Sequence, residues 1–146
     1  MSDSADPVAG LLVNIDVGDL TQAVAFYTAG LGLAVRRRLA PNIVELRGGS
    51  CPVFLTEHAA GTQPCPGAPR AREYCRHWTP VHLDFVVPEV EAAAHRAESA
   101  GARSEGPIRE FSWGRYIIMS DPFGNGFCLL QFKGSGYVSL EPSAGT

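Results

Sequence analysis

The sequence predicts an α+β protein in which one strand–helix–strand–strand–strand unit is used twice. Two observations support this. In residues 10–33, and again in residues 79–102, a segment of alternating residues leads into a helix-like segment that stops at glycine. Three strand-like segments with turn-forming residues between them then follow each helix-like segment. Identity between the two halves is slight, so the repeat lies in the pattern of elements.

The first unit opens with residues 11–17, LLVNIDV. Successive side chains of a strand point to opposite faces, so Leu12, Asn14 and Asp16 share one face and the apolar residues between them share the other. We therefore expect a strand with one apolar side and one mixed side.

The helix of the first unit begins at Asp19, and Gln22 completes a capping-box pattern three positions later. The glycines at 30 and 32 end it. Its apolar positions recur at the spacing of one helix face and are Leu20, Val24, Tyr27 and Leu31.

Each helix is followed by three expected strands. In the first module, placed at residues 10–58, these are residues 33–39, 42–48 and 51–57. The second module is placed at residues 80–133. It has a strand at 81–87, a helix with Val90, Ala94, Ala97 and Gly101 in register, and strands at 102–111, 115–120 and 126–132.

A connection at residues 59–79 separates the modules and contains prolines, glycines and arginines without an apolar period. Its length is typical either of a functional lid or of a mobile linker, and the sequence leaves both open. Residues 1–9 are expected to be disordered and residues 134–146 to form a poorly ordered tail. In that tail, Tyr137, Val138 and Leu140 are apolar enough to dock on a partner.

Composition and charge narrow the classes of function. The net charge of −3 comes without a long basic cluster, so no nucleic-acid partner is expected. No apolar run approaches a membrane span, and the N-terminus lacks the features of a signal peptide, so we expect a cytoplasmic protein without a membrane partner. The cysteines are irregularly spaced without a CxxC and are expected to be reduced thiols. A glycine-rich loop of the Rossmann type is missing between strand and helix.

Two motifs about 100 residues apart carry a family resemblance. DLTQAVAFYTAGLGL and SDPFGNGFCLL resemble the helix and the Asp-Pro-x-Gly-Asn hairpin of the vicinal oxygen chelate superfamily, the glyoxalase, bleomycin-resistance and dioxygenase-like proteins. The resemblance covers residues 10–133. It implies two βαβββ modules that form half-open barrels around a ligand cavity, a small-molecule ligand and a homodimer.

Metal-dependent members of this superfamily hold one divalent ion through His or Glu side chains on cavity-facing strands. The matching positions here are Leu12, Phe54, His82 and Cys128, of which only His82 is a standard ligand. The resemblance therefore implies no metal cofactor, with His82 as the ligand if one binds.

A nonstandard metal set stays open as the less favoured alternative. A shift in the fourth-strand register would bring Glu57 or His58 into play, and a Cys128 thiolate can join His82 around zinc. Against this, Cys128 lies in FCLLQF, where it fits a small buried apolar residue.

Polar residues on the mixed faces of the two module-opening strands are the candidates for chemistry. Asn14 and Asp16 stand opposite His82 and Asp84 when VNIDV is aligned with VHLDF. Histidine side chains titrate near neutral pH, so we expect His82 to be the acid–base group, oriented by Asp84 or Asp16. Simple ion pairs for the carboxylates, and a hydrogen-bonded core position for the histidine, remain the alternatives.

The expected ligand-binding residues combine arginines with aromatic side chains. Arg36 and Arg38 share one face of a strand by alternation, and either can pair with the carboxylates or bind an anion. In SWGRY, Trp113, Arg115 and Tyr116 suit the mouth of a cavity. The full expected set is Asn14, Arg36, Arg38, Phe54, Trp113, Arg115, Tyr116 and Cys128. Ordinary core and interface packing is the alternative for the aromatic residues.

Three hypotheses follow. The chain is a metal-independent binder of a small molecule, or an enzyme of the lyase, isomerase or dioxygenase kind that uses His82 or a metal, or an assembly protein with a vestigial cavity.

Overall fold

The computed structural model describes residues 8–143, and residues 1–7 of the segment expected to be disordered lie outside that range. The first module consists of β1 (Val13–Val17), α1 (Leu20–Ala29), β2 (Ala34–Ala40), β3 (Ile43–Arg47) and β4 (Val53–Glu57). The second consists of β5 (Leu83–Val86), α2 (Val90–Ser99), β6 (Arg103–Ser104), β7 (Arg109–Phe111), β8 (Gly114–Ser120) and β9 (Gly126–Phe132). A 3₁₀-helix, η1 (Gly136–Leu140), follows.

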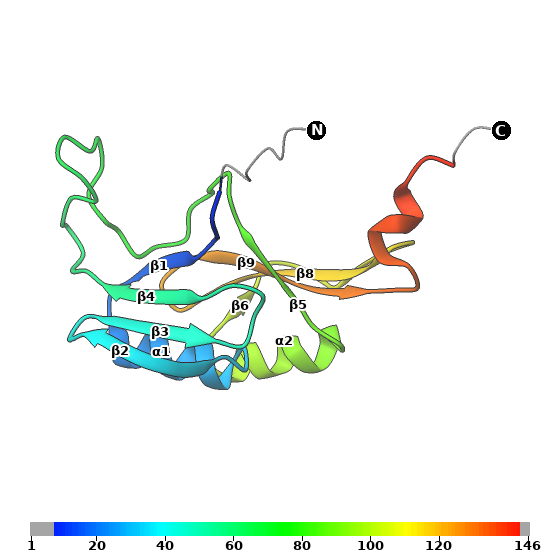
Figure 1. The fold of residues 1–146 in the computed structure, drawn as a ribbon, viewed down its shortest axis with the longest axis horizontal. Coiled ribbons are helices and arrows are strands. Elements are labelled where there is room, and N and C mark those ends of the chain that lie inside the picture. Colours follow the sequence, from blue (N-terminus) through cyan, green and yellow to red (C-terminus); the bar gives the residue numbers. More distant parts are fainter. Residues whose placement is uncertain (1–7, 144–146) are drawn as a thin grey trace.

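The strands form two sheets, one in each module, and both helices lie beneath them (Figure 1). The order is β1-β4-β3-β2 in the first sheet and β5-β9-β8-β6 in the second, where β7 also pairs with β8. In each module the opening strand runs parallel to the last strand, β1 to β4 and β5 to β9. The sheets do not close, so the predicted α+β fold of two half-open βαβββ modules is confirmed.

The helices form where the capping and apolar patterns place them. The side chain of Asp19 accepts a 2.8 Å hydrogen bond from the backbone N–H of Gln22, which satisfies one of the free donors at the start of α1. The buried residues of α1 are Leu20, Ala23, Phe26 and Tyr27, so the buried face includes more of the small and aromatic residues than expected. The buried residues of α2 are Val90, Ala93, Ala94 and Ala97. Burial of these faces against the sheets stabilises both helices.

A buried polar cluster joins the two modules. Tyr27 on α1 donates a hydrogen bond to Oδ2 of Asp121, and Oδ1 of Asp121 accepts from the backbone N–H groups of Phe123 and Asn125. The side chain of Asn125 also donates to the backbone oxygen of Asp16 on β1. Burial, and then the adjacent Asp121 carboxylate, raise the pKa of Tyr27. The hairpin motif at residues 121–125 thus fixes one module on the other.

The first sheet differs from the expected alternation at its edge strand. Irregularities in the β2–β3 register place Arg37 opposite Glu45 and Arg38 opposite Val44. Arg36 and Arg37 both contact the buried carboxylate of Glu45. The prediction that Arg36 and Arg38 share one face of the strand is therefore wrong, because bulges interrupt the two-residue period that the prediction assumed.

Two further differences lie in the second module. The strand expected at residues 102–111 is two short strands, β6 and β7, separated by a loop that contains Gly106 with φ of 157°. Part of the tail expected to be poorly ordered is the 3₁₀-helix η1. Its Tyr137 packs edge-on against Phe132 of β9, at 4.8 Å between ring centroids. Packing within this chain orders that segment.

The connection between the modules has no helix or strand, and side chains anchor it. Arg72 Nε lies 2.8 Å from Oδ2 of Asp16, and the hydroxyl of Tyr74 donates a 2.6 Å hydrogen bond to the backbone oxygen of His58. The Tyr74 ring also packs edge-on against Phe123. This supports a fixed covering segment rather than a linker. Within residues 8–143, no helix has both the length and the apolar character that a membrane crossing requires.

Candidate functional site

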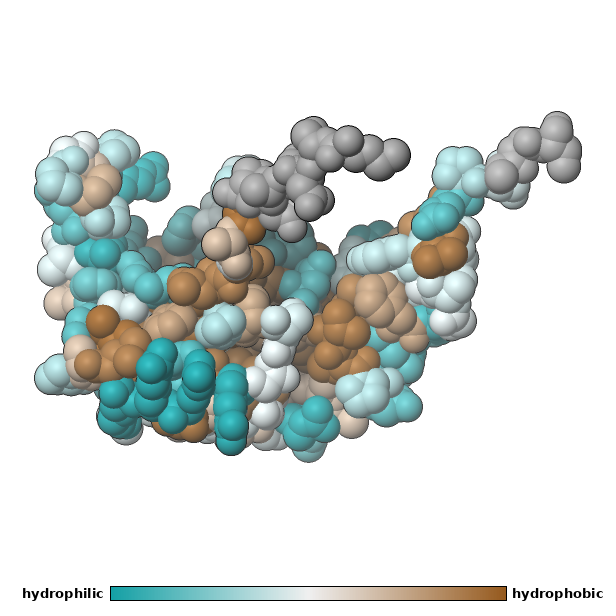
Figure 2. Space-filling model, viewed as in Figure 1, coloured by the Kyte–Doolittle hydropathy of each residue, from teal (hydrophilic) through white to brown (hydrophobic). Residues whose placement is uncertain are grey.

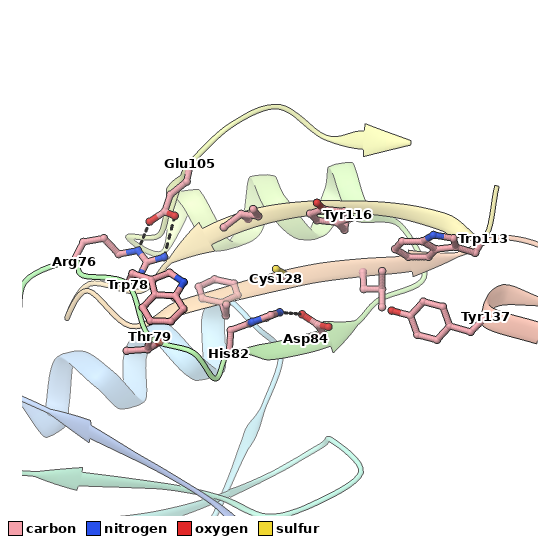
Figure 3. A pocket seen from close by; sticks show the side chains of 14 residues that line it. Arg76, Trp78, Thr79, His82, Asp84, Glu105, Trp113, Tyr116, Cys128 and Tyr137 are labelled. Atoms are coloured by element: carbon pink, nitrogen blue, oxygen red, sulfur yellow. Dashed lines mark hydrogen bonds and ion pairs between the residues drawn. The ribbon is translucent and has the colours of Figure 1, made fainter. Parts of the chain in front are cut away.

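A cavity of about 450 Å³ lies on the face of the second sheet that is turned away from α2. Strand β9 runs along it, with Cys128 on the cavity side (Figure 3). Gly126 and Leu130 of the same strand also line the cavity. At about 3.3 Å per residue, the strand gives the site a length of about 20 Å. Different side chains gather at each end and at the middle of this length.

At the middle of the cavity lie His82, Asp84 and Cys128. The parallel register places Asp84 on β5 opposite Cys128 on β9, and His82 lies on the same side of the chain two residues earlier. Nε2 of His82 is 3.3 Å from Oδ1 of Asp84. The donor atoms of all three side chains lie within 4.8 Å of one another. The predicted pairing of His82 with Asp84 is present in this geometry.

The Cys128 side chain is a neutral thiol at ordinary pH. Burial, followed by the charge of the neighbouring Asp84, raises the pKa of Cys128 to about 12. Only 9% of the residue is exposed. Without a cation beside it, this group acts as a weak hydrogen-bond donor and not as a nucleophile.

One end of the cavity is formed by an ion pair between Arg76 of the connection and Glu105 of the β6–β7 loop (Figure 3). Arg76 donates to Glu105 through Nε and, at 3.1 Å, through Nη2. The paired Arg76 lowers the pKa of Glu105. The guanidinium lies over Gly126, where an added Cβ would be 2.8 Å from Nη2. A glycine at this position therefore lets the arginine reach the cavity.

Aromatic side chains line the opposite end. Trp113 and Tyr137 lie there with ring centroids 5.0 Å apart (Figure 3). Phe111 of β7 stacks on Trp113 at 5.2 Å and on Tyr116 at 5.5 Å. This group rigidifies the wall and presents flat apolar surface to the cavity.

The predicted site residues divide between this cavity and other places. His82, Asp84, Trp113, Tyr116 and Cys128 line it together. Sequence reasoning missed the roles of Arg76, Glu105 and Tyr137. Arg76 lies in the connection, which has no periodic pattern, and Glu105 lies in a loop where a strand was predicted, so nothing local in the sequence indicates that they pair.

Three expected ligand-binding residues are held elsewhere. Arg115 pairs with Glu91 of α2 and with Glu110. Its neighbour Tyr116 faces the cavity, so alternation along β8 directs Arg115 away from it. Arg36 lines a separate hollow beside Glu45 on the first sheet, and Phe54 lies half-buried on β4 opposite Asn14. The expectation that Arg115 lines the cavity mouth is wrong in this structure.

Asn14 and Asp16 line a second cavity of about 370 Å³, between the modules, which shares His82 with the first. Asn14 accepts a 2.9 Å hydrogen bond from Thr56, and Asp16 is paired with Arg72. The structure thus brings Asn14 and Asp16 to the neighbourhood of His82, but Asp84 is the carboxylate that contacts it.

The sequence matches the family model described as a glyoxalase-like domain over residues 12–130. The chain belongs to the glyoxalase-like domain family. This confirms the predicted membership of the vicinal oxygen chelate superfamily. No curated protein sequence gives a significant match to this glyoxalase-like chain.

Solved structures with a similar fold include members of the same superfamily. The monoclinic form of the fosfomycin resistance protein FosX from Listeria monocytogenes has a TM-score of 0.70 and 15% identity, covering 92% of this chain and 99% of that one. A glyoxalase-related enzyme from Fulvimarina pelagi has a TM-score of 0.67 and 19% identity, covering 85% and 88%. Hypothetical protein SA1046 from S. aureus has a TM-score of 0.64 and 19% identity, covering 86% and 99%. At sequence identities this low, the similarity to these structures is a similarity of fold.

Proposed function

We propose that this glyoxalase-like protein binds a small, flat, largely apolar molecule in the cavity of its second module. The aromatic lining carries the proposal, because Trp78, Trp113, Tyr116 and Tyr137 all border one cavity. Aromatic faces bind flat ligands by stacking and by burial of apolar surface. A cavity of about 450 Å³ is within the size range of small-molecule sites.

Binding of this kind needs no metal ion. Leu12 and Phe54 have no donor atom at two positions where metal-dependent relatives in the superfamily hold their ion. Leu12 is 56% exposed on the approach to β1 and does not border the cavity. Stacking and apolar burial therefore supply the affinity in this proposal, and His82 and Asp84 supply polar contacts.

The test is a fluorescence titration with acridine, a neutral flat molecule at pH 7.5. The chain has two tryptophans, Trp78 and Trp113, and both border the cavity, so quenching of tryptophan emission reports occupancy of this site. We expect saturable quenching with one acridine per chain. Trp113→Ala should weaken binding about fivefold, since a stacked aromatic pair contributes about 1 kcal/mol.

The matched control is Leu39→Ala, which truncates an exposed apolar side chain on β2 of the first sheet. It should leave the acridine affinity unchanged. Linear quenching without saturation, or equal loss of affinity in both variants, would show that acridine does not occupy the aromatic cavity.

A second candidate function is metal-dependent or His82-dependent catalysis, favoured by the closeness of His82, Asp84 and Cys128. One histidine, one carboxylate and one thiolate are a set that zinc accepts, with a fourth position open for a substrate oxygen. A mutant of FosX from Listeria monocytogenes, a structural neighbour, has been solved with Mn(II) and 1S,2S-dihydroxypropylphosphonic acid. A bound ion held by His82, Asp84 and Cys128 would supply Lewis-acid chemistry. In the form without an ion, His82 would instead move a proton while Asp84 orients its ring.

Elemental mass spectrometry on tag-free protein separates the two candidates. Near-stoichiometric metal in the native chain, lost in His82→Ala and in Cys128→Ala, would support the catalytic candidate. Protein that holds no metal after dialysis against zinc, and that shows no rise in Tm on zinc addition, would rule out the metal-dependent form of catalysis.

The proposal includes a homodimer and a small-molecule partner. Large apolar side chains are exposed beside the opening strands, with Leu12 at 56%, Trp78 at 80% and Val81 at 76%. Figure 2 shows apolar surface gathered at the middle of the molecule, with hydrophilic side chains over the edge near β2. Exposed apolar patches of this kind are typical of protein interfaces. Light scattering should give twice the chain mass of 15.6 kDa.

A further inference from the structure

The charged side chains bordering the cavity leave one carboxylate without a cationic partner when His82 is neutral. Arg76 and Glu105 form an ion pair, so their opposite charges cancel. Asp84, whose side chain is 41% exposed, faces Nε2 of His82 at 3.3 Å. A neutral imidazole can orient this carboxylate by donating a hydrogen bond, but it does not remove the negative charge. Asp84 is therefore the charged group that remains available to a ligand.

Aromatic side chains line the same cavity as this carboxylate. Trp78 borders the cavity near His82, and Tyr116 lies on the other side of Cys128 (Figure 3). The negative electrostatic face of an aromatic ring attracts cations as well as apolar groups. A carboxylate among aromatic rings therefore favours a positively charged flat molecule over a neutral one of the same shape.

The arginine at the end of the cavity is less available to an anion. Arg76 donates to both carboxylate oxygens of Glu105 and to the backbone oxygen of His77. A ligand anion would have to displace Glu105, and the displaced carboxylate would then add a second negative charge beside the cavity. Arg76 is the only arginine or lysine among the described residues that line it.

We propose that this cavity selects flat organic cations, such as protonated heteroaromatic amines, with Asp84 as their counter-ion. The proposal rests on the proposed function and adds the chemical class of the ligand. In this proposal Asp84 selects for a positively charged ligand, and the aromatic side chains select for a flat one.

The test compares three acridines that share one flat skeleton and differ in charge at pH 7.5. These are 9-aminoacridine, a cation; acridine, which is neutral; and acridine-9-carboxylate, an anion. Affinities are measured by quenching of tryptophan emission in EDTA-treated protein, so that a metal does not contribute. We expect 9-aminoacridine to bind about tenfold more tightly than acridine, and the carboxylate to bind more weakly than either.

Two variants test which charged residue of the cavity causes the preference for a cationic ligand. Asp84→Asn should lower the affinity for 9-aminoacridine until it lies within about twofold of the affinity of the same variant for acridine. Glu105→Gln, which frees Arg76, should weaken 9-aminoacridine and strengthen acridine-9-carboxylate. Glu98→Gln removes an exposed charge on α2 outside the cavity and should change none of the three affinities. Circular dichroism and Tm establish that each variant is folded.

The neutral probe reports the proposed function, and the difference between probes reports the charge preference. If acridine binds and 9-aminoacridine binds no more tightly, the preference for cations is wrong and the aromatic site stands. A preference that survives Asp84→Asn overturns the assignment of Asp84. Tightest binding of acridine-9-carboxylate would show that a ligand anion exchanges with Glu105 at Arg76. If none of the three binds, the proposed function and this inference both fail.

Discussion

The hydroxyl of Tyr27 donates a 2.6 Å hydrogen bond to Oδ2 of Asp121, and the two residues are 94 positions apart in the chain. Both are buried, with Tyr27 at 2% and Asp121 at 4% exposed. Tyr27 belongs to the helix of the first module, and Asp121 to the hairpin before the last strand of the second. The bond therefore links the two sequence motifs that carry the family resemblance.

Removal of this hydroxyl should destabilise the whole chain. In Tyr27→Phe, Asp121 keeps its backbone donors and Asn125 but loses one charge-assisted hydrogen bond in a buried site. We expect the free energy of unfolding to fall by about 1–3 kcal/mol. Urea unfolding measures the change, and Tyr137→Phe, at a half-exposed ring, is the control and should shift it by less than about 0.5 kcal/mol. Equal effects of the two substitutions would contradict the role of this bond.

Stability should fall at alkaline pH through Cys128. Burial and Asp84 raise the pKa of its thiol from 9.0 to about 12, so the folded chain holds this proton more tightly than the unfolded chain does. The stabilisation is complete below pH 9 and is lost as pH rises toward 12. Tyr27, whose pKa is also raised by burial, acts in the same direction.

The Cys128→Ala variant distinguishes the contribution of the thiol to this pH dependence from that of Tyr27. Unfolding midpoints in urea, measured from pH 7 to pH 11, should decline less steeply above pH 9 for the variant than for the parent. Cys51→Ala, at a half-buried position on the loop before β4, is the matched control. Parallel curves for parent and Cys128→Ala would show that the thiol is not protected by the fold.

The contrast between predicted and missed residues has a physical origin. Alternation along one strand places His82 and Asp84 on the same side, and the sequence shows this directly. Arg76 and Glu105 are 29 residues apart, and they meet because the connection crosses the end of the second sheet. The three-dimensional course of the chain brings such a pair together, and local sequence patterns do not reveal it.

Strand alternation also failed where the backbone departs from the regular ladder. Arg36 and Arg38 are two apart, but irregular pairing at β2 lets Arg36 and Arg37 share Glu45. A bulge shifts every later side chain to the other face, and single-sequence patterns do not mark its position. The helix caps and glycine stops depend only on neighbouring residues, so they could be predicted.

The connection should become accessible to proteolysis when Arg72 is neutralised. Arg72 is 14% exposed at its side chain, pairs with Asp16 and donates a 2.8 Å hydrogen bond to the backbone oxygen of Gln63. In Arg72→Gln these anchors are lost, and brief digestion with subtilisin should cut within residues 59–79 several times faster than in the parent chain. Arg70→Gln, on the same exposed segment, is the control and should not change the rate. Unchanged cleavage in Arg72→Gln would mean that Tyr74 and its neighbours hold the connection without it.

Two neighbouring glycines should respond differently to alanine, because different groups occupy the space above them. At Gly124 the φ of 83° is strained for alanine, and an added Cβ would lie 2.5 Å from the backbone carbon of Cys75. Gly124→Ala should therefore lower the free energy of unfolding by about 2 kcal/mol or more. At Gly126 the nearest atoms belong to the guanidinium of Arg76, the movable end of a long side chain.

Gly126→Ala should instead change the cavity while costing less than about 1 kcal/mol in stability. The new methyl group displaces Arg76 from Glu105, which leaves the Glu105 carboxylate uncompensated at the end of the cavity. Affinity for 9-aminoacridine should rise a few-fold, and affinity for acridine should stay the same. Urea unfolding and the fluorescence titration measure the two effects on one preparation. A variant with the stability loss of Gly124→Ala and no change in probe affinity would show that Arg76 does not occupy the space above Gly126.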